Sequence, residues 1–393
     1  QYGERIRLGY PNTCYISCAH GFAAAFSRSV FIRRHASSVQ DLARMLVYLS
    51  VFTTALGLLC IGNRRNIPVA VWMSLGLLIV FSGLRDGVGI DFPAYWDLYR
   101  GNEYSQSEAG FRLLCGILTR LGFGPQAMFL ATSAIVVVFV YKAAVYYDKT
   151  HVCFAFFVFL FAGTFLESLN LVRQYVAIAL FFWGSRYIVG RSPTKYMLVV
   201  LAASLFHISA LVLLPFYWLL RIRFPGWLLF GILGFSLVLS FIFPLKGLIS
   251  MIPRYGQYLT LYSEANQTAA LGLGYFSKLL IAFAVILFRK KLLGVEAVKY
   301  TVVMNGFIFY VALMTLFNDF MVFLRISYYF HIFIILLLPR LAMPFTYRSR
   351  PIVLGIASAY CLLLCFLSLK APDAYMIPYR ANLDLWTTAT PLR

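Results

Sequence analysis

Long apolar runs alternate with short polar connections along most of the chain. About 20 apolar residues in a helix cross the roughly 30 Å of hydrocarbon in a bilayer, and most of the runs approach that length. The pattern therefore predicts an all-α polytopic membrane protein with about ten transmembrane helices. The predicted spans are residues 45–61, 67–84, 124–146, 152–167, 173–189, 226–245, 274–288, 300–317, 322–339 and 351–369.

One apolar stretch, residues 196–220, does not fit a single crossing. It has the length of one span, yet Lys195 precedes it and Arg221 and Arg223 follow it. Because Lys and Arg accumulate in cytoplasmic loops, a single crossing would place the last two on the wrong side and invert every later loop. We therefore predict a broken or re-entrant element that turns near "FHIS" (206–209). Such backbone is tolerated in a membrane only where protein buries it or it lines a wet cavity.

The charges assign the two ends of the predicted helices to opposite membrane faces. Six connections and the adjoining helix ends hold sixteen Lys or Arg and only two acids, Asp148 and Glu296, so we expect them to be cytoplasmic. Most other carboxylates fall on the opposite, outer face. Short amphipathic helices are expected there, and aromatic residues recur at helical spacing in one of them, at 92, 95, 96 and 99. That aromatic face suits either a helix lying at the headgroup level or a wall for stacking sugar rings.

The first 44 residues differ from the rest, since they contain no Met and carry six Arg among Ser, His and Ala. We interpret 1–44 as a non-native or disordered N-terminal extension, with Met45 as the natural first residue. A basic targeting segment is the alternative. Residues 45–380 are expected to form a single membrane-embedded domain, followed by a C-terminal tail at 381–393.

Composition narrows the function without naming it. The 393 residues are 61% hydrophobic, with mean hydropathy +0.80 and a net charge of +20. The basic loops beside the predicted spans explain this charge, so no nucleic-acid partner is expected. The seven Cys show neither a CxxC pair nor Cys/His metal spacing, and we predict neither a metal site nor a cofactor.

Three arginines, Arg85, Arg173 and Arg325, fall at the outer ends of three different predicted spans. Charges near a bilayer core cost a few kcal/mol each, so they are usually paired or functional. The arginine fork suits phosphate oxygens. We therefore predict that these arginines bind a pyrophosphate.

His207 lies in the predicted break and is our candidate for the base that takes a proton from an acceptor hydroxyl. Asp91 and Glu108 compete for that catalytic role. Structural alternatives stand beside these roles: interfacial snorkelling, an ion pair across a hairpin, or a histidine that satisfies a buried carbonyl. Residues expected to position the substrate are Asp86, Glu167, Asn170, Gln174, Ser209, Tyr328 and Tyr379.

Several stretches together resemble the EpsG-like family of Wzy-type exopolysaccharide and O-antigen polymerases. They are "GLRDGVGIDFPAYWDLY", "EAGFRLL", "SLNLVRQYVAIAL", "LAASLFHISALVLLPFYWL", "FLRISYYF" and "IPYR", in the family's order over about residues 45–380. The sequence departs from the family at Phe92, where Tyr is typical, so a hydrogen bond to substrate is not assured there.

The resemblance implies a metal-independent glycosyltransferase of the bacterial inner membrane. It would join polyprenyl-pyrophosphate-linked oligosaccharide repeat units at the outer face by inverting glycosyl transfer. The expected partners are the lipid-linked glycan donor and acceptor and membrane lipid. A chain-length regulator and a flippase are further expected partners.

Two other classes of function remain open. A polysaccharide flippase or anionic-solute transporter would bind its substrate with the same arginines. Transporters usually show internal repeats and a midplane site, and this sequence shows no convincing repeat. The break at "FHIS" nevertheless keeps that alternative open. A membrane acyltransferase that modifies polysaccharide would also use an embedded histidine.

Overall fold

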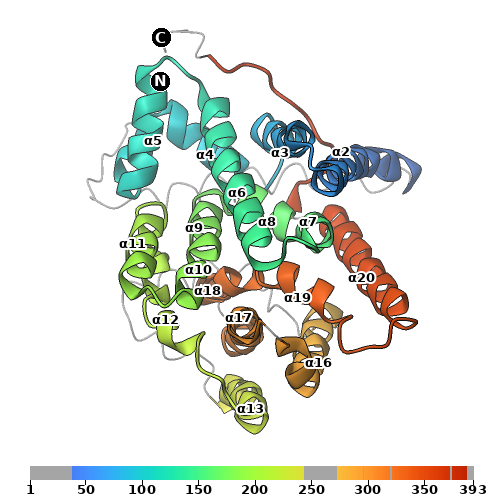
Figure 1. Cartoon of the computed structure of the whole chain (residues 1–393). Helices are drawn as coiled ribbons and strands as arrows, with labels where there is room; N and C mark the ends of the chain where they lie inside the picture. The colour runs from blue at the N-terminus through green and yellow to red at the C-terminus, as the bar shows by residue number, and fades with distance from the viewer. Residues whose placement is uncertain (1–37, 243–271, 295, 319–320, 372–373, 387–393) are drawn as a thin grey trace.

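The computed structural model describes residues 38–242, 272–294, 296–318, 321–371 and 374–386, and the regular elements in these ranges are helices (Figure 1). In order they are α2 (Ser38–Arg65), α3 (Pro68–Gly83), α4 (Phe92–Arg100), η2 (Glu103–Gln106), α5 (Ala109–Arg120), α6 (Pro125–Asp148), α7 (Val152–Phe161), α8 (Thr164–Asn170), α9 (Val172–Gly184), α10 (Arg186–Val189), α11 (Pro193–Ser204), η3 (Ile208–Leu213), α12 (Phe216–Leu219), α13 (Gly226–Ile242), α16 (Leu273–Leu293), α17 (Ala297–Leu316), α18 (Met321–His331), α19 (Ile334–Arg340) and α20 (Arg350–Lys370). Most of the predicted extension, 1–37, and the end of the predicted tail, 387–393, lie outside the described residues.

All ten predicted spans coincide with helical structure, but the count of about ten crossings is not confirmed. Within the described residues, four helices are long and apolar enough to cross a membrane: α2 from Arg44 onward, α6, α17 and α20. The count reaches six if each of two bent helix pairs forms one span. Others are too short or too charged to pass the same test, since α9 has 13 residues and α16 carries several basic residues. The apolar helices identify a membrane protein.

The helices pack around a large aromatic and aliphatic core. In Figure 1, α6, α9, α18 and α19 lie in the middle, and α2, α13 and α20 lie at the edge. The hydrophobic window of α17 is 67% buried, whereas that of α20 is 17% buried. An apolar helix surface that protein does not cover is the expected lipid-facing surface in such a bundle.

Two helix pairs are sharply bent near the centre of the bundle. α7 and α8 meet at a bend of 51°, where Gly163 adopts a positive φ of 95° that glycine tolerates without strain. The α18 and α19 segments meet at a bend of 45°. The broken helices touch each other, because α7 packs on α19 and Glu167 of α8 contacts His331 at the end of α18. Polar side chains are thereby brought between apolar helices.

The predicted break in residues 196–220 is confirmed. The helix α11 ends at Ser204, and His207 adopts extended backbone angles (φ −154°, ψ 112°) before η3 begins. The chain then turns back along α11, since Tyr196 donates a hydrogen bond to the Leu213 carbonyl and its ring lies 5.5 Å from that of Tyr217. The "FHIS" residues therefore form the tip of a hairpin.

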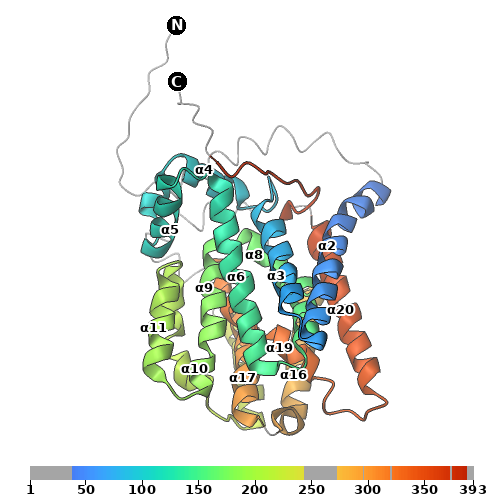
Figure 2. The ribbon, with the colours of Figure 1, turned by 45° about the horizontal axis from the view of Figure 1, so that its top comes forward.

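Short helices α4 and α5 lie at one end of the bundle, away from α10 (Figure 2). The aromatic face of α4 is partly covered by neighbouring helices. Phe92 stacks on Phe129 of α6 at 4.8 Å, and Tyr95 packs edge-on against Phe111 of α5 at 6.0 Å. These contacts bury Phe92 and leave Tyr95 half-buried, and a single helical periodicity cannot reveal such partners.

The residues after α20 cross the ends of α3 and α6 as an extended strap. The Asp86 N–H donates to the Arg380 carbonyl, the Asn382 N–H to Leu84, and the Gly124 N–H to Leu385. Part of the predicted tail is therefore docked on the bundle. The strap fixes the loop that joins α3 to α4.

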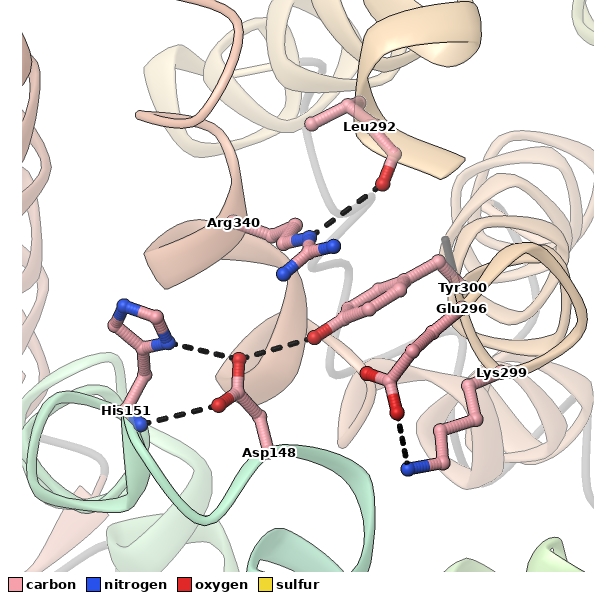
Figure 3. A network of polar contacts seen from close by, with 7 residues as sticks. All are labelled: Asp148, His151, Leu292, Glu296, Lys299, Tyr300 and Arg340. Atoms are coloured by element: carbon pink, nitrogen blue, oxygen red, sulfur yellow. Dashed lines mark hydrogen bonds and ion pairs between the residues drawn. The ribbon is translucent and has the colours of Figure 1, made fainter. Parts of the chain in front are cut away.

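A separate polar network ties the basic connections at the other end (Figure 3). Oδ2 of Asp148 accepts hydrogen bonds from the His151 Nδ1 (2.9 Å) and the Tyr300 hydroxyl (3.0 Å). The Arg340 guanidinium lies 3.9 Å from the centre of the Tyr300 ring, and its Nε donates to the Leu292 carbonyl. This network joins the α6–α7 connection to α17 and α19, so we assign it a structural role.

Candidate functional site

A short ion pair joins Arg173, in the first turn of α9, to Glu108, the residue before α5. Arg173 Nη1 lies 2.5 Å from Glu108 Oε2, and each side chain is 17% exposed. The Arg173 Nε also donates to the Tyr95 hydroxyl of α4 at 3.3 Å. These contacts hold the Arg173 guanidinium, which is half-buried, where α4, α5 and α9 meet.

Glu108 also faces the break after α11. Its Oε1 accepts a hydrogen bond from the Ile208 N–H at 3.4 Å and lies 3.3 Å from the His207 Nδ1. That Nδ1 meets no hydrogen-bond geometry with a described residue, so its contact with Glu108 is electrostatic. The three sequence-predicted residues His207, Glu108 and Arg173 therefore lie together.

Opposing influences set the pKa of the Glu108 carboxyl. Burial alone raises the pKa, but the His207 imidazole and the Arg173 charge outweigh burial and lower the pKa to about 2. An opposite charge at this distance favours the ionised carboxyl. Glu108 therefore stays charged near neutral pH and is a weak proton acceptor there.

The helix α18 connects to both sides of this cluster. Gln174 Nε2 donates to the Arg325 carbonyl at 2.6 Å, and the hydroxyls of Ser209 and Tyr329 lie 3.0 Å apart. The first contact ties α18 to α9, and the second ties it to the "FHIS" hairpin. The Arg325 side chain is exposed, and its backbone lies beside the first turn of α9, which holds Arg173.

Asp91 precedes α4, and the positive charges of Arg173 and Arg325 both act on its carboxyl. Burial raises the pKa of its carboxyl, and the charges of Arg325 and Arg173 oppose that rise. The carboxyl makes no cap hydrogen bond to α4. Asp91 is thus a half-buried acid near two cations, with a higher proton affinity than an ordinary aspartate.

Arg85 lies apart from this cluster, although it was predicted beside the other arginines. Its side chain is 1% exposed, and its guanidinium donates to the carbonyls of Ser82 (2.5 Å), Val88 (3.2 Å) and Leu169 (2.8 Å). The guanidinium also lies 4.5 Å from the centre of the Phe129 ring. These bonds use the arginine fork to brace the end of α3 against the α8–α9 hairpin.

Three more predicted residues lie in the same supporting region. The Asn170 Oδ1 accepts a hydrogen bond from the Ile90 N–H at 2.8 Å. The Tyr379 hydroxyl donates to the Phe81 carbonyl at 2.7 Å. Asp86 is half-buried beside the strap, and its N–H is the group that bonds the strap. The Asn170 side chain thus bonds the loop between α3 and α4, and the Tyr379 hydroxyl bonds α3 itself.

Glu167 belongs to a second, deeper cluster. Its Oε2 accepts hydrogen bonds from the Tyr175 hydroxyl (2.7 Å) and the His331 Nδ1 (3.1 Å). Tyr328 and Lys278 lie in its electrostatic surroundings. This cluster and the Arg173 cluster flank the first turn of α9, because residues 173 and 175 point to different sides of the helix.

Sequence reasoning missed His331 and Lys278. Both fall inside apolar runs that were predicted as spans, 322–339 and 274–288. An ionisable residue in a membrane span is a functional hypothesis by default, so the signal was present in the sequence. Tyr175 and Tyr329 carried no such signal, because tyrosine is common in buried helices.

The fold and the polar clusters define a class of protein: a helical membrane protein that gathers charged side chains from several helices at one end of its bundle. The EpsG family profile matches residues 69–381, and the chain belongs to the EpsG family. Membership indicates a polysaccharide polymerase-type, glycosyltransferase-like function. Comparisons with curated proteins and with solved structures found no match.

Proposed function

We propose that the protein joins polyprenyl-pyrophosphate-linked oligosaccharide repeat units into exopolysaccharide or O-antigen. The reaction is inverting glycosyl transfer at the outer face of a bacterial inner membrane. The observation that carries the proposal is the half-buried cluster of Arg173, Glu108 and His207, with Asp91 and Arg325 around it. Family membership supplies the polymerase-type activity.

Arg173 and Arg325 bind the pyrophosphate of the donor. Both carry forked donors, and they lie at the end of the bundle that holds the short helices α4 and α5. When the glycosidic bond to the carrier breaks, negative charge grows on the departing pyrophosphate, and fixed cations stabilise that charge. Arg85 supports the site by bracing its loop, since its fork is already used by three carbonyls.

His207 takes the proton from the acceptor hydroxyl, and Glu108 holds the imidazole near the reacting groups. The low pKa of Glu108 favours this orienting role over direct proton transfer. Asp91 is the competing base, because burial strengthens its hold on a proton. The acceptor oxygen then bonds to the anomeric carbon as the carrier pyrophosphate leaves with the bonding electrons. No resident metal or cofactor takes part.

A reconstituted reaction tests the proposal. Purified protein in lipid is given one defined undecaprenyl-pyrophosphate-linked repeat unit, and the glycan products are separated by size. We expect a ladder of polymers from the wild type and single repeats only from Arg173→Ala and His207→Ala. Normal ladders from both variants would contradict the assigned roles.

The transporter alternative has one structural observation in its favour. Two broken helices meet at a Glu–His contact, and discontinuous helices are a feature of transporter sites. The reconstituted reaction also distinguishes the two functions, if the protein is placed in lipid vesicles. A flippase moves the lipid-linked unit between leaflets without changing the length of its glycan.

A further inference from the structure

Glu167 presents one fixed and one free carboxylate oxygen deep between the helices. Both hydrogen bonds to the side chain, from Tyr175 and His331, end on Oε2. No hydrogen bond or ion pair from the described residues ends on Oε1, and 27% of the Glu167 side chain is accessible. A carboxylate held through one oxygen keeps the other oriented toward whatever fills the accessible space.

His331 keeps this carboxylate in place. The imidazole is 1% exposed, stacks on Tyr310 with ring centres 4.5 Å apart, and directs Nδ1 to Glu167. Its Nε2 is buried and has no hydrogen-bond partner among the described residues. Such buried unsatisfied groups are rare and call for an explanation, such as a missing ligand or water.

Lys278 adds a cation to the same cluster. It lies near the start of α16, and its ammonium is 5.3 Å from the centre of the Tyr310 ring. No described acid lies within ion-pair distance of it, although its charge acts on Glu167 and on Tyr328. A lysine in an apolar helix is costly, which indicates a ligand or a wet cavity beside it.

The charges select the chemical class of the ligand. The Glu167 carboxylate repels a free anion, and the Lys278 ammonium repels a free cation. Neither kind of ion is therefore a well-matched ligand for this cluster. Hydroxyl groups suit both, because a hydroxyl donates to a carboxylate oxygen and accepts from an ammonium. A neutral ring with several hydroxyls is therefore the matching ligand.

We propose that Glu167 and Lys278 bind the hydroxyl groups of a neutral sugar ring of the lipid-linked repeat unit, with Tyr175 and His331 as positioning residues. This inference rests on the proposed polymerase function and names the part of the substrate that the deeper cluster recognises.

The two clusters share the first turn of α9 and the helix α18. Tyr328 follows Arg325 by one turn of α18, and the charges of Glu167 and Lys278 also act on its hydroxyl. Gln174, between Arg173 and Tyr175, fixes α9 to the Arg325 backbone. A pyrophosphate at the arginines would thus extend its sugar toward Glu167.

Kinetics with the reconstituted enzyme separate the two clusters. Glu167→Gln and Lys278→Met each remove a charged hydrogen-bonding group, which we expect to raise KM for the lipid-linked repeat about tenfold or more. Inhibition by undecaprenyl pyrophosphate, which carries no sugar, should stay within about twofold of wild type in both variants. Arg325→Gln should show the reverse pattern, with weaker inhibition by the sugar-free carrier.

Matched controls come from the other end of the bundle. Glu296→Gln and Lys299→Met make the same substitutions in an exposed ion pair and should leave KM unchanged. Thermal unfolding in lipid identifies a variant that fails to fold, and the half-buried Lys278 is the safer of the two sites to change.

Direct binding distinguishes failure of the inference from failure of the proposed function. Equilibrium binding of the lipid-linked repeat should weaken by a similar factor in both variants, whether or not the wild type forms polymer. A folded Lys278→Met protein with wild-type KM and wild-type binding would overturn the sugar assignment. A wild type that binds the repeat but only translocates it would overturn the polymerase proposal alone.

Discussion

Arg173 and Arg85 both lie at helix ends, but their guanidinium groups have different partners. Arg173 is 17% exposed and forms an ion pair with the Glu108 carboxylate, so part of its side chain is accessible. Arg85 is 1% exposed and its fork is bound to backbone carbonyls. The difference comes from packing, since α6 and α8 cover Arg85.

We expect catalysis to require both the charge of Arg173 and its forked hydrogen-bond donors. We expect Arg173→Lys to lower the polymerisation rate about 100-fold, because lysine keeps the charge but lacks the fork. Initial rates with a defined repeat unit measure the loss. A lysine variant within about threefold of wild type would show that a point charge is enough.

Arg85 should matter for folding stability. Arg85→Ala leaves three buried carbonyls without their donor, which should destabilise the protein by about 3 kcal/mol. Thermal unfolding in detergent measures the effect. Inhibition by sugar-free carrier pyrophosphate should not change in the folded fraction, and a large change there would place Arg85 back in the pyrophosphate site.

Glu108 gives a pH-dependent stability with a defined sign. Its pKa falls from about 4.5 unfolded to about 2 folded, so its contribution is complete above pH 4.5 and is lost as pH falls toward 2. We expect Glu108→Gln to be less stable than wild type at pH 7, by at most about 3 kcal/mol given partial solvent screening. The gap between the two unfolding temperatures should narrow at pH 3, and a constant gap would contradict the ion-pair assignment.

At the scale of elements, the "FHIS" hairpin and α18 are held to each other by few polar contacts. Ser209 and Tyr329 supply one of them. A double-mutant cycle with Ser209→Ala and Tyr329→Phe should give a coupling of about 1 kcal/mol in unfolding free energy. A coupling near zero would mean that the hairpin is positioned by apolar packing alone.

The elements were largely predictable, because apolar length and basic flanks are local properties. The break at His207 followed from Lys195, Arg221 and Arg223 alone. The helix α4 and its aromatic face were predictable from the spacing, but its packing against Phe111 and Phe129 was not, because helical periodicity does not report a distant partner. The pairing of Arg173 with Glu108 was likewise beyond the sequence, because the two residues come from separate helices.

The whole molecule has a polarity that follows from the charges. The α4–α5 connection lies at one end of the bundle, with the ion pair of Arg173 and Glu108 (Figure 2). The network of Asp148 and Tyr300 (Figure 3) lies at the opposite end of α6. The sequence indicated this polarity through the positive-inside rule. It did not indicate that two bent helix pairs would bring Glu167 to His331.

Surface labelling tests this orientation. Cysteines introduced at Ser105 and at Ser192 should react with an impermeant thiol reagent from the outside and from the cytoplasmic side respectively. The re-entrant arrangement predicts that Ile222→Cys reacts from the same side as position 192. Labelling of position 222 only from outside would mean that residues 196–220 cross the membrane.

We propose that the cluster around Arg173, Arg325 and His207 transfers a glycan from its carrier pyrophosphate to an acceptor hydroxyl. The most direct measurement is the product of purified protein with one defined lipid-linked repeat unit. We predict polymers with an inverted anomeric linkage and release of the carrier pyrophosphate, both abolished by Arg173→Ala. Translocated or acylated single repeats, or polymer formed equally well without Arg173, would contradict the account.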